Sequence, residues 1–211
     1  MNLIILGSQG SGKGTQARVL AEKMGLYYFE MGGFLRDLSI HNSQVADYVN
    51  RGILVPDDLF FMSMKELMED KILKGKGMIL DGFPRTQVQY KTLRNWFDEN
   101  GLKIDKIILL EISNDEAVRR LSSRRTCEQC GALYNLVTSP IPADTEKCDK
   151  CGGGLLQRAD DNSEAIKERL SEYRKNTLPL LEQARKDGVL VEINGDQPIE
   201  KVTSDVLANL K

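Results

Sequence analysis

The sequence predicts an α/β protein built on a doubly wound parallel sheet. Five short apolar segments suit buried parallel strands, and the stretches between them have helical periodicity. The segments are residues 3–6, 27–29, 78–80, 107–112 and 189–193. Strands that alternate with helices form a parallel sheet with helices on both faces, and such sheets bind ligands at the carboxyl ends of their strands. We therefore expect five strands with functional residues directly after them.

The first strand is followed at once by a glycine-rich loop, GSQGSGKGT, at residues 7–15. Glycines allow successive N–H groups to converge on one anion, and the helix that follows adds the positive end of its dipole. Lys13 adds a full charge. The usual phosphate-binding pattern has a hydroxyl residue directly after the lysine, whereas this chain has Gly14 there and Thr15 one place later. The loop predicts a site for nucleotide phosphates.

Two stretches interrupt the alternation of strands and helices. Residues 30–59 are helical with little strand signal, and residues 126–157 are rich in Cys, Gly, Pro and Asp. Each is too small to hold much of a core, so we expect both to be insertions that move on hinges. The remaining residues, 1–29, 60–125 and 158–211, form the predicted core domain.

The second insertion holds every cysteine of the chain: Cys127, Cys130, Cys148 and Cys151. Two C-x2-C pairs form two knuckles that complete a closed tetrahedral shell, which is typical of structural zinc. Iron is the alternative metal, and disulfides are disfavoured in a reducing compartment. Metal binding supplies on the order of 10 kcal/mol in such sites. We expect it to provide most of the energy that orders residues 126–157.

The C-terminal part of the chain predicts two helices. After Asp161, apolar residues recur at steps of three and four from Ile166 to Ala184, which predicts a long helix with a kink near Pro179. Pro198 then opens a last helix. Its predicted inner face consists of Ile199, Val202, Val206 and Leu210.

Composition excludes several classes of protein. Charged residues make up 28% of the chain, but the formal net charge is only -2, so no basic field indicates nucleic acid or an anionic membrane. No run of about 18 apolar residues predicts a membrane span, and no export signal follows Met1. We expect a cytoplasmic protein that binds neither nucleic acid nor membranes.

Further motifs join the glycine loop and the cysteines: LVPD at 54–57, DGFPR at 81–85, Arg124-Arg125, Tyr134 and RADD at 158–161. With them, nearly the whole chain resembles the adenylate kinases with a long, zinc-bearing lid. The resemblance implies a P-loop kinase fold that acts as a monomer. It also implies reversible phosphoryl transfer from ATP, with Mg²⁺, to AMP, which gives two ADP. Residues 30–59 would be the AMP-binding insertion and 126–157 the lid, whose motion we expect to limit turnover.

The resemblance also implies roles for individual residues. Phosphoryl transfer needs charge neutralisation more than covalent chemistry, and arginine forks hold phosphate oxygens bidentately. The implied catalytic residues are Lys13, Arg85, Arg120, Arg124, Arg158 and Arg169. Those for ATP are Gly10, Ser11, Gly12, Lys13, Gly14, Thr15, Arg120, Arg124, Leu133, Tyr134 and Gln197. Those for AMP are Met31, Arg36, Ile53, Leu54, Val55, Gly82, Phe83, Pro84, Arg85, Gln89, Arg158 and Arg169. Asp81 would hold Mg²⁺ through water; a helix cap is its alternative role.

Three positions depart from the family pattern. Gln9 stands where the family usually has proline, Met31 where it has a threonine near the AMP base, and Gly33 where it has an aspartate. A lost hydroxyl loosens base discrimination, so a kinase for GMP, CMP or UMP stays an alternative. Two alternatives from other classes are an ATP-dependent zinc-ribbon protein that binds nucleic acid and a nucleotide sensor without turnover.

Overall fold

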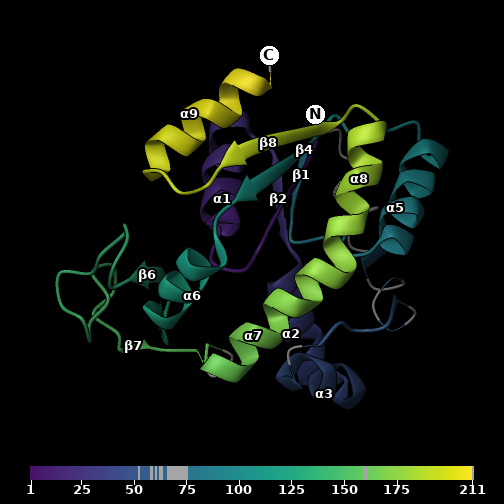
Figure 1. Ribbon diagram of the computed structural model, residues 1–211. Helices are drawn as coiled ribbons and strands as arrows, with labels where there is room; N and C mark the ends of the chain where they lie inside the picture. Colours follow the sequence, from purple (N-terminus) through teal and green to yellow (C-terminus); the bar gives the residue numbers. More distant parts are fainter. Residues whose placement is uncertain are drawn as a thin grey trace.

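The computed structural model describes residues 1–51, 53–57, 59, 61, 64–65, 76–158 and 161–210. Its centre is a five-stranded parallel sheet in the order β2-β3-β1-β4-β8 (Figure 1). The strands are β1 (Asn2–Gly7), β2 (Tyr27–Glu30), β3 (Met78–Asp81), β4 (Lys106–Glu111) and β8 (Leu190–Asn194). Each contains or overlaps one of the five segments that the sequence predicts. The predicted α/β class and parallel sheet are confirmed.

Helices cover both faces of the sheet because successive side chains of each strand point to opposite sides. Leu3 and Ile5 of β1 pack in one core with α1 (Lys13–Met24) and α9 (Ile199–Asn209). Ile4 and Leu6 pack in a second core with α5 (Gln87–Glu99) and α8 (Leu178–Lys186). Figure 1 shows α1 and α9 on one side of the strands and α5 and α8 on the other. Burial on two faces explains why the strands read as continuous apolar runs.

Side chains cap several of the described helices at their N-termini, but not α1. Thr86 caps α5, Ser113 caps α6 (Asn114–Ser122), and Asn162 caps α7 (Ser163–Glu172). Helix α1 begins after Gly12, which has φ 89° and makes no side-chain cap hydrogen bond. The first N–H groups of α1 therefore keep the capacity to bind an anion.

The long helix predicted after Asp161 consists of three consecutive segments. A π-helical turn, η1 (Tyr173–Thr177), joins α7 to α8. The N–H of Leu178 donates to the carbonyl of Tyr173, five residues back. Pro179 follows and has no N–H to donate, so the regular α-helical pattern is interrupted at this point. The predicted irregularity thus lies in the turn before the proline.

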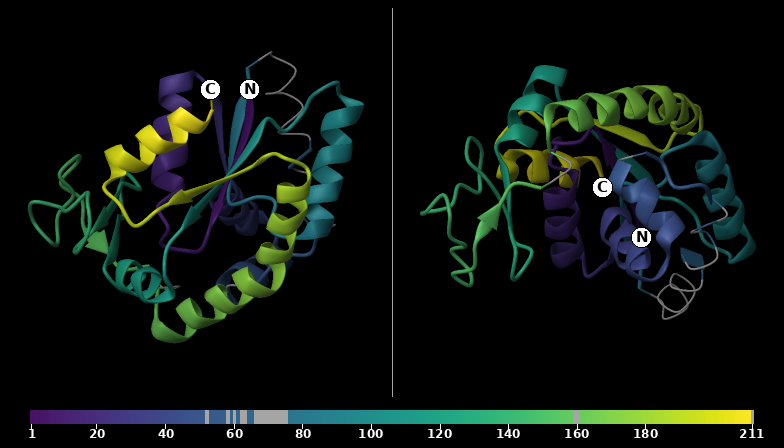
Figure 2. Two further views of the ribbon diagram at one scale, coloured as in Figure 1. Left: turned by 45° about the horizontal axis from the view of Figure 1, so that its top comes forward. Right: turned by 90° about the horizontal axis from the view of Figure 1, so that it is seen from below.

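The first predicted insertion contains α2 (Met31–His41) and α3 (Ser43–Arg51). The second contains a small antiparallel sheet in the order β6-β5-β7. Its strands are β5 (Arg124–Cys127), β6 (Leu133–Asn135) and β7 (Leu155–Leu156). Figure 2 shows this small sheet projecting from the main body, away from both termini. The division into a core and two mobile insertions stays a prediction, and its boundary at residue 60 lies outside the described residues.

No described helix has both the length and the apolar character that a membrane crossing requires.

Candidate active site

A cavity of about 1000 Å³ lies at the carboxyl end of β1, where the glycine loop meets α2, α6, the small sheet and α7. Most residues predicted for the site line it. They are Gly10, Ser11, Gly12, Lys13, Gly14, Thr15, Arg36, Ile53, Leu54, Val55, Asp81, Gly82, Arg85, Arg120, Arg124, Leu133, Tyr134, Arg158, Arg169 and Gln197. Ala159 and Asp160 of the RADD motif lie outside the described residues. The structure therefore brings residues from distant parts of the chain to one cavity.

Four residues predicted to contact AMP do not line this cavity: Met31, Phe83, Pro84 and Gln89. Met31 is buried in the core, with 2% of its surface exposed, so the substituted side chain does not form part of the cavity surface. Gln89 is also buried, and its amide donates to Asp57 at 2.7 Å and accepts the N–H of Arg85 at 2.7 Å. Gln89 thus lies outside the cavity lining and supports it through its hydrogen bonds to Asp57 and Arg85.

The glycine loop has the geometry of an anion cradle. Gly7, Gly10 and Gly12 have φ of 153°, 84° and 89°. A Cβ at Gly7 would lie 2.5 Å from the carbonyl oxygen of Leu110, so the loop passes too close to β4 for any side chain. Lys13 donates to the carbonyl of Ser8 at 3.3 Å. Burial lowers the pKa of Lys13 to about 8, because its charged form is poorly solvated there. A bound anion would stabilise that charged form in place of water.

Gly14 makes room for Asp81 beside the loop. A Cβ at Gly14 would lie 3.1 Å from Oδ2 of Asp81. Asp81 is buried at the end of β3 and accepts a hydrogen bond from the hydroxyl of Tyr28 at 3.0 Å. Burial raises the pKa of Asp81, which indicates that its carboxylate would gain from a nearby cation. The alternative role as a helix cap is not supported, because Thr86 caps the next described helix.

Two carboxylates hold three of the predicted phosphate arginines. Asp161, whose side chain is fully buried, accepts two hydrogen bonds from Arg124, at 2.8 and 2.6 Å, and pairs with Arg169 at 3.4 Å. Glu116 accepts Nε of Arg120 at 2.6 Å, and Arg119 also donates to it. Charge-assisted hydrogen bonds of this kind fix the direction of a guanidinium.

Neither Asp161 nor Glu116 was among the predicted site residues. Glu116 and Arg120 are four residues apart on a helix, and this spacing indicates an ion pair. Asp161 belongs to the RADD motif, but its partner Arg124 lies 37 residues away. A third missed carboxylate, Glu30, lines the cavity and pairs with Arg36 at 3.2 Å. No sequence signal pointed to it.

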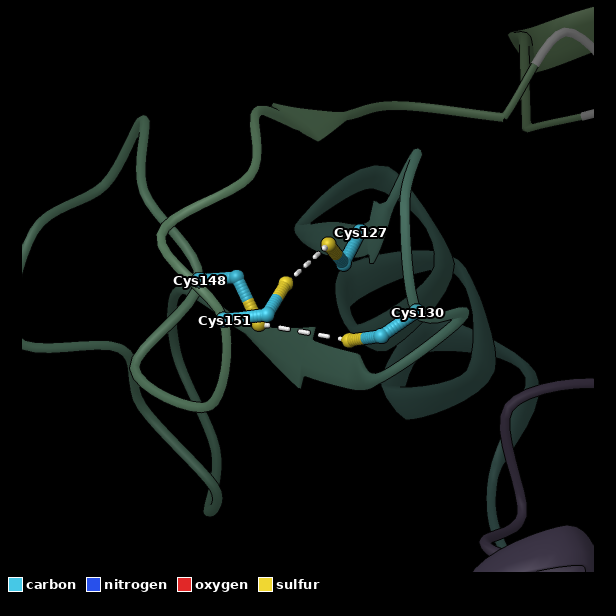
Figure 3. Close-up of side chains that lie close together, drawn as sticks. All are labelled: Cys127, Cys130, Cys148 and Cys151. Carbon is cyan, nitrogen blue, oxygen red and sulfur yellow. Dashed lines mark hydrogen bonds between the residues drawn. The ribbon is translucent and has the colours of Figure 1, made fainter.

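The four cysteines converge at one point (Figure 3). Their sulfur atoms all lie within 4.8 Å of one another, with Cys127 and Cys151 at 3.5 Å and Cys130 and Cys148 at 3.6 Å. Four sulfurs at about 2.3 Å from a zinc ion would be about 3.8 Å apart in a regular tetrahedron. The observed separations fit a metal shell and are far longer than a disulfide bond of about 2.05 Å.

The two cysteine pairs have the same backbone structure. In the first, Cys127 donates to the carbonyl of Ala132 and accepts the N–H of Gly131. In the second, Cys148 donates to Gly153 and accepts the N–H of Gly152. Both Gly131 and Gly152 have positive φ, which such tight turns require. The chain therefore holds the thiols in place through two matching knuckles.

Tyr134 connects the cysteine cluster to the cavity. It lines the cavity, and its hydroxyl lies 3.5 Å from the sulfur of Cys148. That hydroxyl lowers the pKa of the Cys148 thiol to about 6, which favours the thiolate that metals bind. A change in the geometry of the metal site would therefore affect the cavity through the side chain of Tyr134.

Comparisons with known proteins identify the family of this chain. The family model described as "Adenylate kinase" matches residues 5–189. The chain is 41% identical to the adenylate kinase of Archaeoglobus fulgidus, over 100% of this chain and 98% of the relative. It is 42% identical to that of Geobacillus sp. (strain WCH70), over 98% of this chain and 96% of the relative. Identity to the adenylate kinase of Thermosipho melanesiensis is 40%, over 98% of each chain. The chain belongs to the adenylate kinase family.

Proposed function

We propose that the cavity catalyses the reversible transfer of a phosphoryl group from ATP, with Mg²⁺, to AMP, giving two ADP. The observation that carries this proposal is the meeting of the glycine loop with the predicted arginines in one cavity of a chain from the adenylate kinase family. Phosphoryl transfer requires two polyanions held in line and the neutralisation of developing charge. Guanidinium groups around a single cavity can do both.

The donor ATP would bind at the glycine loop. The N–H groups at the uncapped start of α1 and the ammonium of Lys13 would hold its phosphates. Arg120 and Arg124 line the same cavity. Leu133, Tyr134 and Gln197 line the part of the cavity where we place the donor base.

The acceptor AMP would bind between α2 and the segment around Val55. Arg36 and Arg85 line this part of the cavity and would hold the acceptor phosphate. Two hydrogen bonds hold Arg85 in position: its Nε donates to the carbonyl of Gly82 at 2.8 Å, and its backbone N–H donates to Gln89. Arg158 and Arg169 would complete the charge neutralisation between the two nucleotides.

Mg²⁺ would bind beside Asp81, which would hold it through water because this ion gives up water reluctantly. When bound, the ion neutralises charge on the donor phosphates and helps to align them.

We assign zinc to the four cysteines, with iron as the alternative that metal analysis would reveal. The small sheet that carries them would act as a lid that excludes water from the transfer.

The test is to mix the purified protein with Mg²⁺, ATP and each of AMP, GMP, CMP and UMP in turn, and to follow diphosphate formation. We expect ADP from AMP at a rate far above that of the other acceptors. Faster turnover of another monophosphate would reassign the acceptor. Nucleotide binding without any diphosphate would refute the proposal in favour of a sensor. A monomer in sedimentation and no binding to DNA or RNA are further expectations, as is a cytoplasmic location.

A further inference from the structure

Glu30 is a carboxylate inside a cavity that we assign to polyanions, and nothing in the proposed reaction accounts for it. It ends β2 and occupies the N-cap position of α2, but its side chain makes no cap hydrogen bond. The carboxylate instead accepts Arg18 at 3.0 Å, Arg36 at 3.2 Å and the Tyr28 hydroxyl at 3.4 Å. Its side chain is 28% exposed and lines the cavity.

These partners come from both halves of the proposed site. Arg18 lies on α1, the helix that begins at the phosphate loop, whereas Arg36 lies on α2, the first helix of the acceptor side. The Tyr28 hydroxyl shares its single proton between Glu30 and Asp81, and its shorter contact, at 3.0 Å, is to Asp81. Glu30 therefore joins the arginine of the acceptor side to the elements that carry the donor phosphates.

Gly32 leaves room for the contact between Arg36 and Glu30. The guanidinium folds back across the first turn of α2, past Gly32 and Gly33. A Cβ at Gly32 would lie 3.2 Å from Nη1 of Arg36 and 3.6 Å from Oε1 of Glu30. A side chain at Gly32 would require the Arg36 guanidinium to shift by a few tenths of an ångström, whereas a Cβ at Gly33 would lie at an ordinary contact distance of 3.7 Å from Nη2 of Arg36. Gly32 therefore favours the observed contact.

The charges explain why a carboxylate is tolerated at this place. Arg18 and Arg36 together carry two positive charges against the single negative charge of Glu30, so the group as a whole remains attractive to an anion. Glu30 accepts one N–H of Arg36, and a guanidinium has five. A phosphate can therefore bind Arg36 without displacing Glu30.

We propose that Glu30 is a positioning residue for the acceptor nucleotide, whose carboxylate holds the Arg36 guanidinium at the cavity wall while Arg18 neutralises it. This inference rests on the proposed function and extends it to a residue outside the predicted site. A long arginine side chain that is already held in place loses less freedom when it binds a phosphate. Glu30 thus strengthens acceptor binding by acting through Arg36.

The first test is Glu30→Gln, which keeps the shape and removes the charge. We expect the KM for AMP to rise about three- to tenfold and the KM for ATP to stay within about twofold. In an Arg36→Ala background the same change should have no further effect, because the two residues act as a unit. Asp47→Asn is the matched control, since it removes a carboxylate from the exposed Arg51 pair in the same insertion. It should leave both KM values unchanged.

A second variant, Arg18→Met, should also weaken AMP binding, and this effect should vanish in the Glu30→Gln background. A fall in the KM for AMP on Glu30→Gln would overturn the proposal, because it would mean that the carboxylate competes with the acceptor phosphate. An equal rise in the KM for ATP, or a full effect without Arg36, would overturn it as well. Calorimetric titration with AMP measures the same affinities without turnover, so it separates this inference from the proposed reaction.

Discussion

Asp161 offers the sharpest test of how the cavity is built. Its side chain is fully buried and accepts hydrogen bonds from Arg124 and Arg169, whose side chains are 19% and 16% exposed. Asp161→Asn keeps the size of the side chain and removes its charge. The NH2 group of the new amide would face guanidinium groups that also donate. The variant therefore replaces one of the two acceptor oxygens of Asp161 with a donor and removes the negative charge.

The expected loss of stability follows from these contacts. Breaking a fully buried ion pair costs about 3 to 5 kcal/mol, and a lost hydrogen bond to a charged group costs about 1.5 to 3 kcal/mol. Water reaches the two arginines in part, and the asparagine keeps one acceptor oxygen, so we expect a loss near the lower values, about 2 to 3 kcal/mol. For a chain of this length, that lowers the Tm by about 5 to 10 °C.

The expected loss of activity is larger than stability alone would explain. Arg124 and Arg169 would no longer be held in one direction, and a displacement of about 1 Å at a reacting group costs about a hundredfold in rate. We therefore expect ADP formation to fall about 10- to 100-fold at a temperature where the variant is fully folded. The assay is steady-state turnover, combined with thermal unfolding followed by circular dichroism.

Asp187→Asn is the matched control for this experiment. Asp187 also joins several partners, since it accepts the Tyr90 hydroxyl at 2.8 Å and pairs with Arg94, but it does not line the cavity. Its loss should lower the Tm and leave turnover nearly unchanged. If Asp161→Asn lost stability but kept full activity, the carboxylate would not orient the two arginines, and our account of the site would be wrong.

Three further predictions concern the lysine, the lid and the second carboxylate. Lys13→Met should reduce turnover about 100- to 1000-fold. It should also raise the Tm at pH 7, because burial holds the pKa of Lys13 at about 8, below its usual 10.5, and charging it penalises the folded state. The penalty is complete below pH 8 and fades toward pH 10.5, so the two melting curves should converge there. Removing the metal with a chelator should unfold residues 126–157 and spare the parallel sheet, seen as proteolysis confined to that segment; loss of the whole fold in one step would contradict this. Arg119 and Arg120 hold the pKa of Glu116 down at about 2, so Glu116 stabilises the protein above pH 4.5 and less as the pH falls toward 2. Glu116→Gln should therefore lower the Tm at pH 7, with the difference shrinking in acid, and a constant difference would refute the assignment.

The sequence predicted those parts of the site whose signals are local. The glycine loop, the apolar strand before it and the paired cysteines each lie within a short stretch, and each motif has a physical reason for its spacing. The five strands were predicted for the same reason, since a strand buried on both faces is a short apolar run in any sequence. The P-loop kinase fold then followed from resemblance to the family.

The rest depends on contacts between distant segments. Asp161 and Arg124 are 37 residues apart, and nothing in either stretch indicates that they pair. Met31 was expected at the AMP base, but its side chain turns into the core. That choice is made by the packing of α2 against the sheet, which periodicity over one short helix does not specify. The π-helical turn before Pro179 likewise depends on a hydrogen-bond pattern that no single residue type indicates.

The carboxylates that the sequence did not reveal have a common physical role. The arginines of the cavity repel one another when no phosphate is bound. The same repulsion acts on Lys13, because Arg85, Arg169 and Arg124 each lower its pKa in addition to burial. The observed pairs are Arg36 with Glu30, Arg120 with Glu116, and Arg124 and Arg169 with Asp161. Each carboxylate offsets part of that repulsion while it leaves other guanidinium N–H groups for an anion. The acidic residues therefore belong to the phosphate site as much as the basic ones do, since without them the cavity would be folded less stably and its arginines held less firmly when the nucleotides arrive.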